Sequence, residues 1–114
     1  MIRCKLDIRR GLLTRIESTG HAPVRKTWLT RKSARISIAC AAVSTLIRSL
    51  GMLLEKSEFI VIDVETFEPG DVKLKVGQVD ESAEDWLRGL TDMLIQGLED
   101  VKRDFPDQIE LERT

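Results

Sequence analysis

The stretch Ser37-Ile38-Ala39-Cys40-Ala41-Ala42-Val43-Ser44 opens the first long helical pattern of the chain, and the other segments are arranged around it. Ser37 is a typical N-cap residue, and apolar residues then recur at helical spacing as far as Leu54. The members of this stripe are Val43, Leu46, Ile47, Leu50 and Leu54. The pattern predicts a helix over residues 37–54, with Cys40 in its first turn.

Two residues with reactive side chains lie in the first turn of this predicted helix or upstream of it. Cys40 is one of two cysteines, and His21, the single histidine of the chain, follows Gly20 upstream. A thiol in the first turn of a helix lies near the positive end of the helix dipole, which favours its thiolate. A histidine that reaches this thiol supplies a base or the imidazolium of an ion pair, which is the minimal set for nucleophilic catalysis by cysteine.

The residues alone leave a plainer interpretation open. Cys40 would then be a buried core thiol of a dimeric structural protein, and its reactivity toward a thiol reagent in the folded state would distinguish the two cases. Ser44, one turn after Cys40, also has two interpretations. Its hydroxyl either bonds back to the carbonyl four residues earlier or lines the same pocket as Cys40.

Length and composition predict one soluble domain over residues 1–114. The 114 residues are 42% apolar and 32% charged, and we expect no segment to reach the ~20 apolar residues of a membrane span. The N-terminus alternates in polarity, unlike a signal peptide, so we expect a cytoplasmic protein with both cysteines as thiols. No metal-ligand spacing and no phosphate-binding glycine loop are present, so we expect no metal and no cofactor.

Charge is divided unequally between the two halves of the sequence. Residues 1–57 contain 12 Lys and Arg but 3 Asp and Glu, whereas residues 58–114 contain 6 and 16. One interpretation is a basic face that meets an anionic partner or an acidic face of another subunit. The other is that the opposite charges intermix once the chain folds.

The remaining patterns predict two hairpins, a second helix and a short C-terminal segment. Residues 2–9 and 12–18 alternate around the turn Arg10-Gly11, and residues 58–65 and 72–76 alternate around Pro69-Gly70-Asp71. Ile60, Ile62 and Val64 are expected to face inward, while Phe59 and Val61 make the other face of that strand apolar, so a partner could cover it.

The second helix is expected to begin at a capping box and to end at a proline. Ser82-Ala83-Glu84-Asp85 has the pattern of the box, and Pro106 follows the helix. The apolar positions between them are Trp86, Leu87, Leu90, Met93, Leu94, Leu98 and Val101. Residues 108–112 are either a short terminal strand or a tail.

These elements predict an α+β fold, a two-layer sandwich of ββαββα order. A mostly antiparallel four-stranded sheet would carry both helices on one face. Residues 22–36 are expected to form a loop, which contains Trp28 and five basic residues without an acid. Such a loop could cover a cleft or contact RNA through phosphates and stacking.

Three segments together resemble the ribosomal-processing cysteine protease (Prp) family of bacteria. They are Gly20-His21-Ala22 after the first hairpin, Cys40-Ala41-Ala42-Val43-Ser44 at the first helix, and Gly97-Leu98-Glu99-Asp100-Val101 in the second. The resemblance extends over nearly the whole chain. It implies a small cytoplasmic homodimeric protease that removes the N-terminal extension of a large-subunit ribosomal protein, the one numbered twenty-seven, for ribosome assembly.

By the resemblance, Cys40 is the nucleophile, His21 its partner, and Ser44 the serine one turn later. Ser37 stands where the family usually has an Asp, and 18 residues separate His21 from Cys40, more than is usual in the family. Ser37, Gly20 and Ala41 are expected to support the site, with backbone N–H groups near Cys40 and Ala41 stabilising the oxyanion. The basic loop allows a contact with ribosomal RNA. The alternative function is a non-catalytic ribosome- or RNA-associated module that uses this loop.

Overall fold

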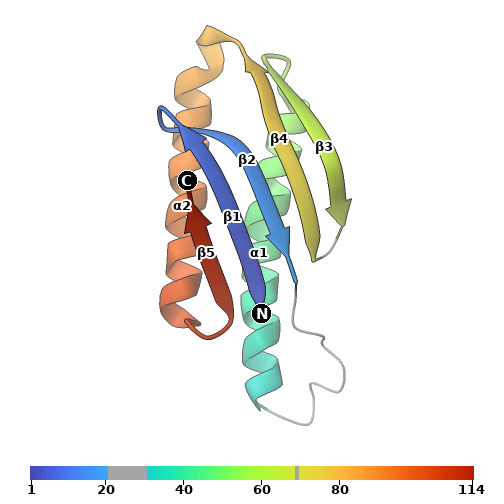
Figure 1. Ribbon diagram of the computed structural model, residues 1–114, viewed down its shortest axis with the longest axis vertical. Coiled ribbons are helices and arrows are strands. Elements are labelled where there is room, and N and C mark those ends of the chain that lie inside the picture. The colour runs from blue at the N-terminus through green and yellow to red at the C-terminus, as the bar shows by residue number, and fades with distance from the viewer. Residues whose placement is uncertain (21–30, 69) are drawn as a thin grey trace.

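The computed structural model describes residues 1–20, 31–68 and 70–114, and of residues 31–37 only the backbone. Two hairpins are each followed by a helix, and a short strand ends the chain. The elements are β1 (Ile2–Arg9), β2 (Leu12–Thr19), α1 (Arg31–Lys56), β3 (Ile60–Glu68), β4 (Asp71–Val79), the 3-10 turn η2 (Glu81–Ala83), α2 (Glu84–Asp104) and β5 (Ile109–Arg113). Both helices lie on one face of the sheet, which confirms the predicted two-layer α+β fold (Figure 1).

The sheet has five strands, in the order β3-β4-β2-β1-β5, so the predicted count of four is wrong. Residues of the C-terminal segment form β5, which pairs parallel to β1, whereas the other neighbours are antiparallel. The segment is a strand rather than a tail because Ile109 is buried and the N–H of Ile2 donates to the carbonyl of Gln108 at 2.9 Å. Burial and edge pairing together fix this segment on the sheet.

Helix α1 begins at Arg31, six residues before the predicted start at Ser37. Ser37 is therefore not the N-cap, and residues 31–36 of the predicted loop are helical. The physical reason is that Lys, Arg and Ala favour helix and that no Pro or Gly interrupts residues 31–37, so the helix extends backward past the serine. The rest of that loop, residues 22–30, lies outside the described residues.

One side of α1 forms much of the core between the layers. Val43, Ile47, Leu50 and Leu54 are buried as predicted, while Leu46 is partly buried against them. By length and composition alone, Ile38–Lys56 could also cross a membrane, contrary to the expectation that no segment reaches that length. The core helix of a globular domain meets the same criterion, and this stripe packs inside the domain.

Helix α2 is anchored to the first hairpin by a buried threonine. The predicted turn Arg10-Gly11 has positive φ at both residues, and a β-bulge then shifts the β1–β2 register after Asp7. The N–H of Leu13 donates to Thr91 Oγ1 at 3.0 Å, and the Thr91 hydroxyl donates to the carbonyl of Leu87 at 2.8 Å. Thr91 is 0% exposed, and its hydroxyl both accepts and donates a hydrogen bond. It therefore fixes the position of α2 against the first hairpin.

The start and the exposed face of α2 differ from the prediction in two details. Asp80 caps the 3-10 turn η2 that precedes α2, and its side chain accepts from the N–H of Ser82 at 2.9 Å. The N-cap of α2 itself is Ala83, which makes no side-chain cap hydrogen bond, so the predicted box on Ser82 does not form. The Ser82 hydroxyl, which donates to the same carboxylate at 2.7 Å, and then the Ser82 N–H lower the pKa of the Asp80 carboxyl. Trp86 and Met93, assigned to the apolar stripe, are exposed.

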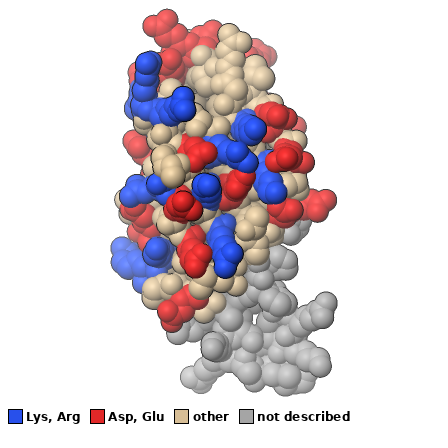
Figure 2. Space-filling view, in the orientation of Figure 1, with Lys and Arg blue, Asp and Glu red and all other residues tan. Residues whose placement is uncertain are grey.

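The open face of the sheet explains the division of charge along the sequence. Basic β1 residues lie opposite acidic residues of β5 and β2, because the register pairs Arg3 with Glu110 and Lys5 with both Glu112 and Glu17. Arg3 Nε lies 3.3 Å from a carboxylate oxygen of Glu110. Figure 2 shows blue and red side chains interspersed over this face. Across this face, folding intermixes the charges.

Strand β3 is an edge strand with more exposed apolar surface than the alternation predicts. Ile60 is buried, but Val64, expected to face the core, is exposed, because register shifts interrupt the β3–β4 pairing on both sides of Ile62–Val64. Phe59 and Val61 are exposed as well. The edge of the sheet therefore carries a strip of apolar side chains.

Candidate active site

A cavity of ≈ 170 Å³ lies between α1 and the sheet, where the two hairpins end. Its floor comes from the start of β1, the end of β2 and the β3–β4 turn, and its roof comes from α1. The lining residues are Ile2, Ser18, Gly20, Cys40, Val43, Ser44, Ile47, Arg48, Phe67, Glu68, Gly70, Asp71 and Val72. The pocket thus brings together residues that lie up to 70 positions apart in the sequence.

One face of α1 supplies the chemistry of this pocket. Cys40, Ser44 and Arg48 are spaced four residues apart, so they stand above one another along the helix, about 6 Å per step. Cys40 is half-buried, and Ser44 and Arg48 are exposed. Among the described residues, no hydrogen bond returns from the Ser44 hydroxyl to the helix backbone, so this hydroxyl can meet a ligand in the pocket.

Gly20 is held at the pocket by contacts that exclude a side chain. Its φ is +82°, its N–H donates to the carbonyl of Gly70 at 2.9 Å, and a Cβ built on it would lie 2.4 Å from the carbonyl oxygen of Met1. Only glycine fits this position without a shift of the backbone. The end of β2 is therefore fixed beside Cys40, at the residue that immediately precedes His21.

The other predicted site residues are distributed as follows. His21 lies outside the described residues, and Ser37 is the seventh residue of α1, with only its backbone described. Ala41 is exposed on α1 and is not one of the residues that line the cavity. Of the predicted set, the described structure therefore gathers Cys40, Ser44 and Gly20 at one pocket.

The electrostatic reason given for the reactivity of Cys40 requires correction. Cys40 is the tenth residue of α1, in the third turn, about 13 Å along the axis from the helix start. The helix dipole acts within the first turn, so it does not stabilise a thiolate here as predicted. Inside a helix, the N–H groups of Cys40 and Ala41 point to carbonyls four residues earlier, so they are not available as the expected oxyanion donors.

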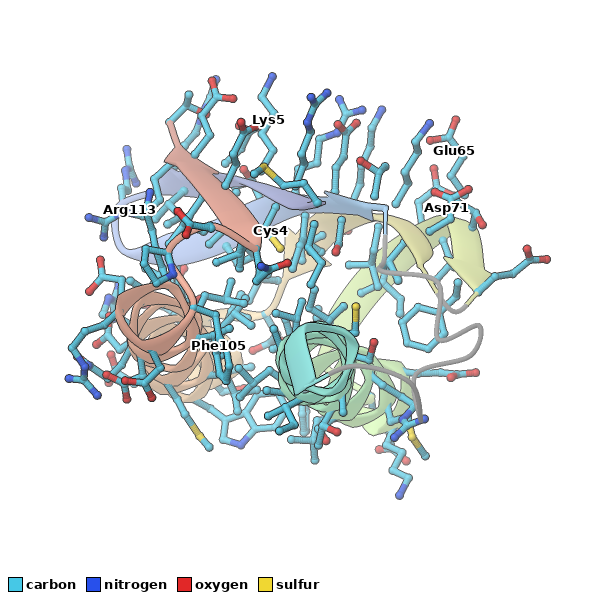
Figure 3. The ribbon with its side chains drawn as sticks, turned by 90° about the horizontal axis from the view of Figure 1, so that it is seen from below. Cys4, Lys5, Glu65, Asp71, Phe105 and Arg113 are labelled. Atoms are coloured by element: carbon cyan, nitrogen blue, oxygen red, sulfur yellow. The ribbon has the colours of Figure 1, made fainter. Side chains whose placement is uncertain are left out.

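A buried hydroxyl forms part of the pocket floor, and a second thiol lies beside it on the neighbouring strand. Ser18 is 6% exposed, and its hydroxyl oxygen lies 3.6 Å from the Cys4 sulfur, across the β1–β2 pair in which the two residues are partners. Figure 3 shows Cys4 pointing toward the helices, while Lys5 points to the open face. Burial raises the pKa of the Cys4 thiol, and the hydrogen bond with Ser18 offsets part of that rise.

Three charged side chains at the rim were not predicted. Arg48 lines the pocket from α1, and Glu68 and Asp71, which are register partners across the β3–β4 turn, line it from the sheet. Within the described part of the chain, no ion pair joins Arg48 to either carboxylate. The helical spacing from Cys40 would have found Arg48, whereas nothing in the sequence shows which way the second hairpin faces.

The described residues contain no group of three or more His, Cys, Asp or Glu side chains placed to hold a metal ion. The pocket itself offers a thiol, two serine hydroxyls and charged side chains. A thiol, a hydroxyl one turn away and an apolar cavity beside them are features of a site that binds a side chain next to a nucleophile.

Comparisons with known proteins define the class and then the family. The class is that of the cysteine proteases, because the family model "Cysteine protease Prp" matches residues 1–110. The chain belongs to the Prp family of cysteine proteases. As a member of an enzyme family, it is not the non-catalytic module considered as an alternative.

Solved structures agree over the full length of the fold. A ribosomal processing protease Prp from S. aureus, in complex with a covalently linked product peptide, is 14% identical with a TM-score of 0.71, and both chains are covered completely. The same protease with a substrate peptide is 15% identical with a TM-score of 0.68, again over both complete chains. SMU.848 from Streptococcus mutans is 23% identical with a TM-score of 0.72, over 100% of this chain and 97% of that one. A comparison with curated proteins finds no match.

Proposed function

We propose that this protease removes the N-terminal extension of a large-subunit ribosomal protein, number twenty-seven, during ribosome assembly in the cytoplasm. The observation that carries the proposal is the pocket that unites Cys40, Ser44 and Gly20, the residue bonded to His21. The S. aureus neighbours, described as ribosomal processing proteases and bound to peptides, support this choice of substrate. Family membership supports the reaction type.

Cys40 is the proposed nucleophile and His21 the proposed base. His21 takes the thiol proton, and the Cys40 sulfur attacks the scissile carbonyl carbon. The C–N bond then breaks as His21 returns the proton to the leaving amine. Water attacks the resulting thioester, which releases the carboxylic acid and restores the thiol. Gly20, the residue before His21 in the chain, lines the pocket.

Stabilisation of the oxyanion needs a donor other than the N–H groups of Cys40 and Ala41. Ser44 stands one helical turn from Cys40, lines the same cavity, and makes no hydrogen bond to the described residues around it. We assign its hydroxyl to the substrate carbonyl or the oxyanion. Replacement of Ser44 by alanine should lower kcat about 10- to 100-fold and change KM little, because the bond is strongest in the transition state.

Peptide cleavage tests the proposal directly. A peptide that spans the junction between the extension and the mature ribosomal protein is incubated with wild type, Cys40→Ala and His21→Ala, and the products are identified by mass spectrometry. We expect kcat to fall by a factor of about 10³ or more in both variants. Ser49→Ala, an exposed serine of α1 outside the pocket, is the control. Undiminished cleavage by Cys40→Ala would refute the assignment.

The resemblance also implies a homodimer, and we propose that the edge strand β3 forms its interface. Val61 is 61% exposed, and Val64 on the same strand and Phe59 just before it are exposed apolar residues as well. An edge strand with an apolar strip is a typical pairing surface. Val61→Lys should turn the dimer into a monomer in sedimentation, whereas Met93→Lys, at an exposed apolar residue of α2, should leave it dimeric. If wild type sediments as a monomer at two protein concentrations that differ 100-fold, the proposed interface is refuted.

Contact with ribosomal RNA is proposed for the basic segment 22–36. The open face of the sheet offers no uniform positive field, because its charges alternate, so the basic segment is the better candidate (Figure 2). Replacement of Arg25 and Lys26 by glutamine should weaken RNA binding. It should also make the slope of log K against log salt concentration shallower, by the amount expected for about two lost phosphate contacts. The same substitution of Lys73 and Lys75, on the open face, serves as the control. Equal effects of the two double variants would contradict this contact.

A further inference from the structure

The floor of the pocket contains one buried polar side chain among apolar ones. Val72 is the β4 register partner of Ser18, Ile2 lines the same pocket from β1, and Val43 and Ile47 line it from α1. Ser18 is 6% exposed, so its hydroxyl has left water. A buried hydroxyl costs free energy unless it is well bonded, and a serine at this position therefore calls for an explanation.

The hydrogen bond that Ser18 makes is a weak one. Among the described residues its partner is the Cys4 sulfur at 3.6 Å, and a thiol is a poor donor and a poor acceptor. If the thiol donates, the hydroxyl proton of Ser18 stays available, and if Ser18 donates, its lone pairs stay available. In both arrangements the hydroxyl keeps an unused hydrogen-bonding site at the bottom of the cavity.

Thr91 shows what a purely structural hydroxyl looks like in this protein. In the part of the chain that the structure describes it is the other buried polar residue, and it has two strong partners, the N–H of Leu13 and the carbonyl of Leu87. It lines neither the cavity nor its rim. Ser18 differs in both respects, since it lies at the pocket that contains Cys40 and its hydroxyl is underused.

We propose that Ser18 is a specificity-determining residue of the protease. It selects a substrate side chain that has an apolar stem and a hydroxyl group at its tip. This inference rests on the proposed peptide hydrolysis at Cys40. The stem packs against the apolar walls, and its hydroxyl exchanges a hydrogen bond with Ser18 at the floor. A cavity of ≈ 170 Å³ can hold such a side chain, because a dry protein cavity of about 150 Å³ already admits a benzene molecule.

Matched peptides that differ by a single hydroxyl test the proposal. Pairs with Val or Thr, and with Phe or Tyr, are placed at each of the four residues on either side of the scissile bond. At the position that fills the pocket, we expect wild type to prefer the hydroxylated member about 3- to 10-fold in kcat/KM, the value of one net hydrogen bond. The preference should fall to one or below in Ser18→Ala.

Two further variants separate specificity from a structural effect. Ser18→Thr keeps the hydroxyl and should keep the preference. Cys4→Val removes the competing thiol partner and should increase the preference, because the Ser18 hydroxyl is then unpaired without substrate. Ser49→Ala, exposed on α1 and outside the cavity, should leave the ratio unchanged. A merely structural Ser18 would shift stability without moving these ratios.

The result that overturns the inference is distinct from one that overturns the proposed function. Cys40-dependent cleavage with a ratio near one at every position, or with the same ratio in Ser18→Ala, refutes the role of Ser18 alone. Absence of cleavage refutes the proposed function, and the pocket is then tested by affinity. The same pairs are titrated into Cys40→Ala protein, and equal dissociation constants for both members of every pair refute the inference.

Discussion

The two buried hydroxyl side chains among the described residues lie at two different kinds of junction. Thr91 joins α2 to the bulged hairpin with two hydrogen bonds of ordinary length, and it is completely enclosed. Ser18 lies between the sheet and α1, has a thiol 3.6 Å away, and borders a cavity. The comparison teaches that satisfaction, rather than burial alone, separates a polar group that holds the fold from one that is left for a ligand.

The packing around the two hydroxyls differs in parallel with their hydrogen bonding. Around Thr91 the packing is closed, with Leu13 and Leu87 at 0% exposure. Around Ser18 the layers separate enough to leave the pocket, and the charged residues at its rim have solvent access. One end of the sandwich is thus built for stability and the other for binding, and four measurements can break or sharpen this division.

The largest expected difference is in the reactivity of the two thiols, Cys40 and Cys4. Cys40 lines the pocket, whereas Cys4 lies beside Ser18 on the neighbouring strand, does not line the pocket and is 2% exposed, so a small alkylating reagent should modify Cys40 more than about 100-fold faster. Peptide mapping by mass spectrometry measures both rates, and both thiols should react after unfolding in urea. Rapid labelling of Cys4 in the native protein would contradict the enclosure of the Cys4–Ser18 pair in the core.

The second difference is in stability. Thr91→Val leaves the buried N–H of Leu13 without its acceptor and should lower the free energy of unfolding by about 2–3 kcal/mol. Ser18→Ala removes a weak bond and should cost less than about 1 kcal/mol. Urea unfolding measures both, and Thr91→Ser, which keeps the hydroxyl, should recover most of the loss. Equal costs at the two sites would remove the distinction between them.

Alkaline pH gives a smaller, directional test of Cys4. Burial raises the pKa of its thiol in the folded protein above 9.0, so on a rise in pH the unfolded chain loses this proton first. Stability should be unaffected by Cys4 below about pH 8 and should fall above pH 9, by at most about 1.4 kcal/mol per pH unit, until the folded pKa is passed. Cys4→Val should lose this contribution, so its free energy of unfolding should fall less steeply than that of wild type above pH 9. Identical curves for the two proteins would contradict the assignment.

The sequence was sufficient for the layers of the fold but not for its edges. Alternation and helical spacing predicted both hairpins, both helices and the buried positions of Val43, Ile47 and Leu54, because core burial imposes these periods. The fifth strand stayed undecided, since a five-residue segment becomes a strand only when an edge such as that of β1 accepts it. The helix start was misplaced because a good N-cap residue, Ser37, can also lie within a helix when its predecessors favour helix.

For the site, the pattern found the residues that belong to a motif and missed those that depend on packing. Cys40, Ser44 and Gly20 followed from the motif, and the structure brings them to one cavity. Ser18 looked like one more position of an alternating strand, because its role depends on where α1 lies above it. Phe67 was missed for the same reason, since the register of the second hairpin cannot be read from its sequence.

Phe67 gives the last test, because it connects the pocket to a glycine of α1. A Cβ built on Gly51 would lie 2.6 Å from a ring carbon of Phe67, so Gly51→Ala must displace the ring from the pocket wall. The ring edge can move, and alanine favours the helix by about 1 kcal/mol over glycine, so the net change in stability should be small. The KM for the peptide should rise about two- to fivefold.

Gly89→Ala is the matched control on α2, because nothing lies within 4 Å of its built Cβ. It should raise stability by up to about 1 kcal/mol and leave KM unchanged. If Gly51→Ala instead destabilised the protein by several kcal/mol, the ring would belong to the rigid part of the sandwich. The boundary between the stable end and the binding end would then have to be placed on the other side of Phe67, nearer to Cys40.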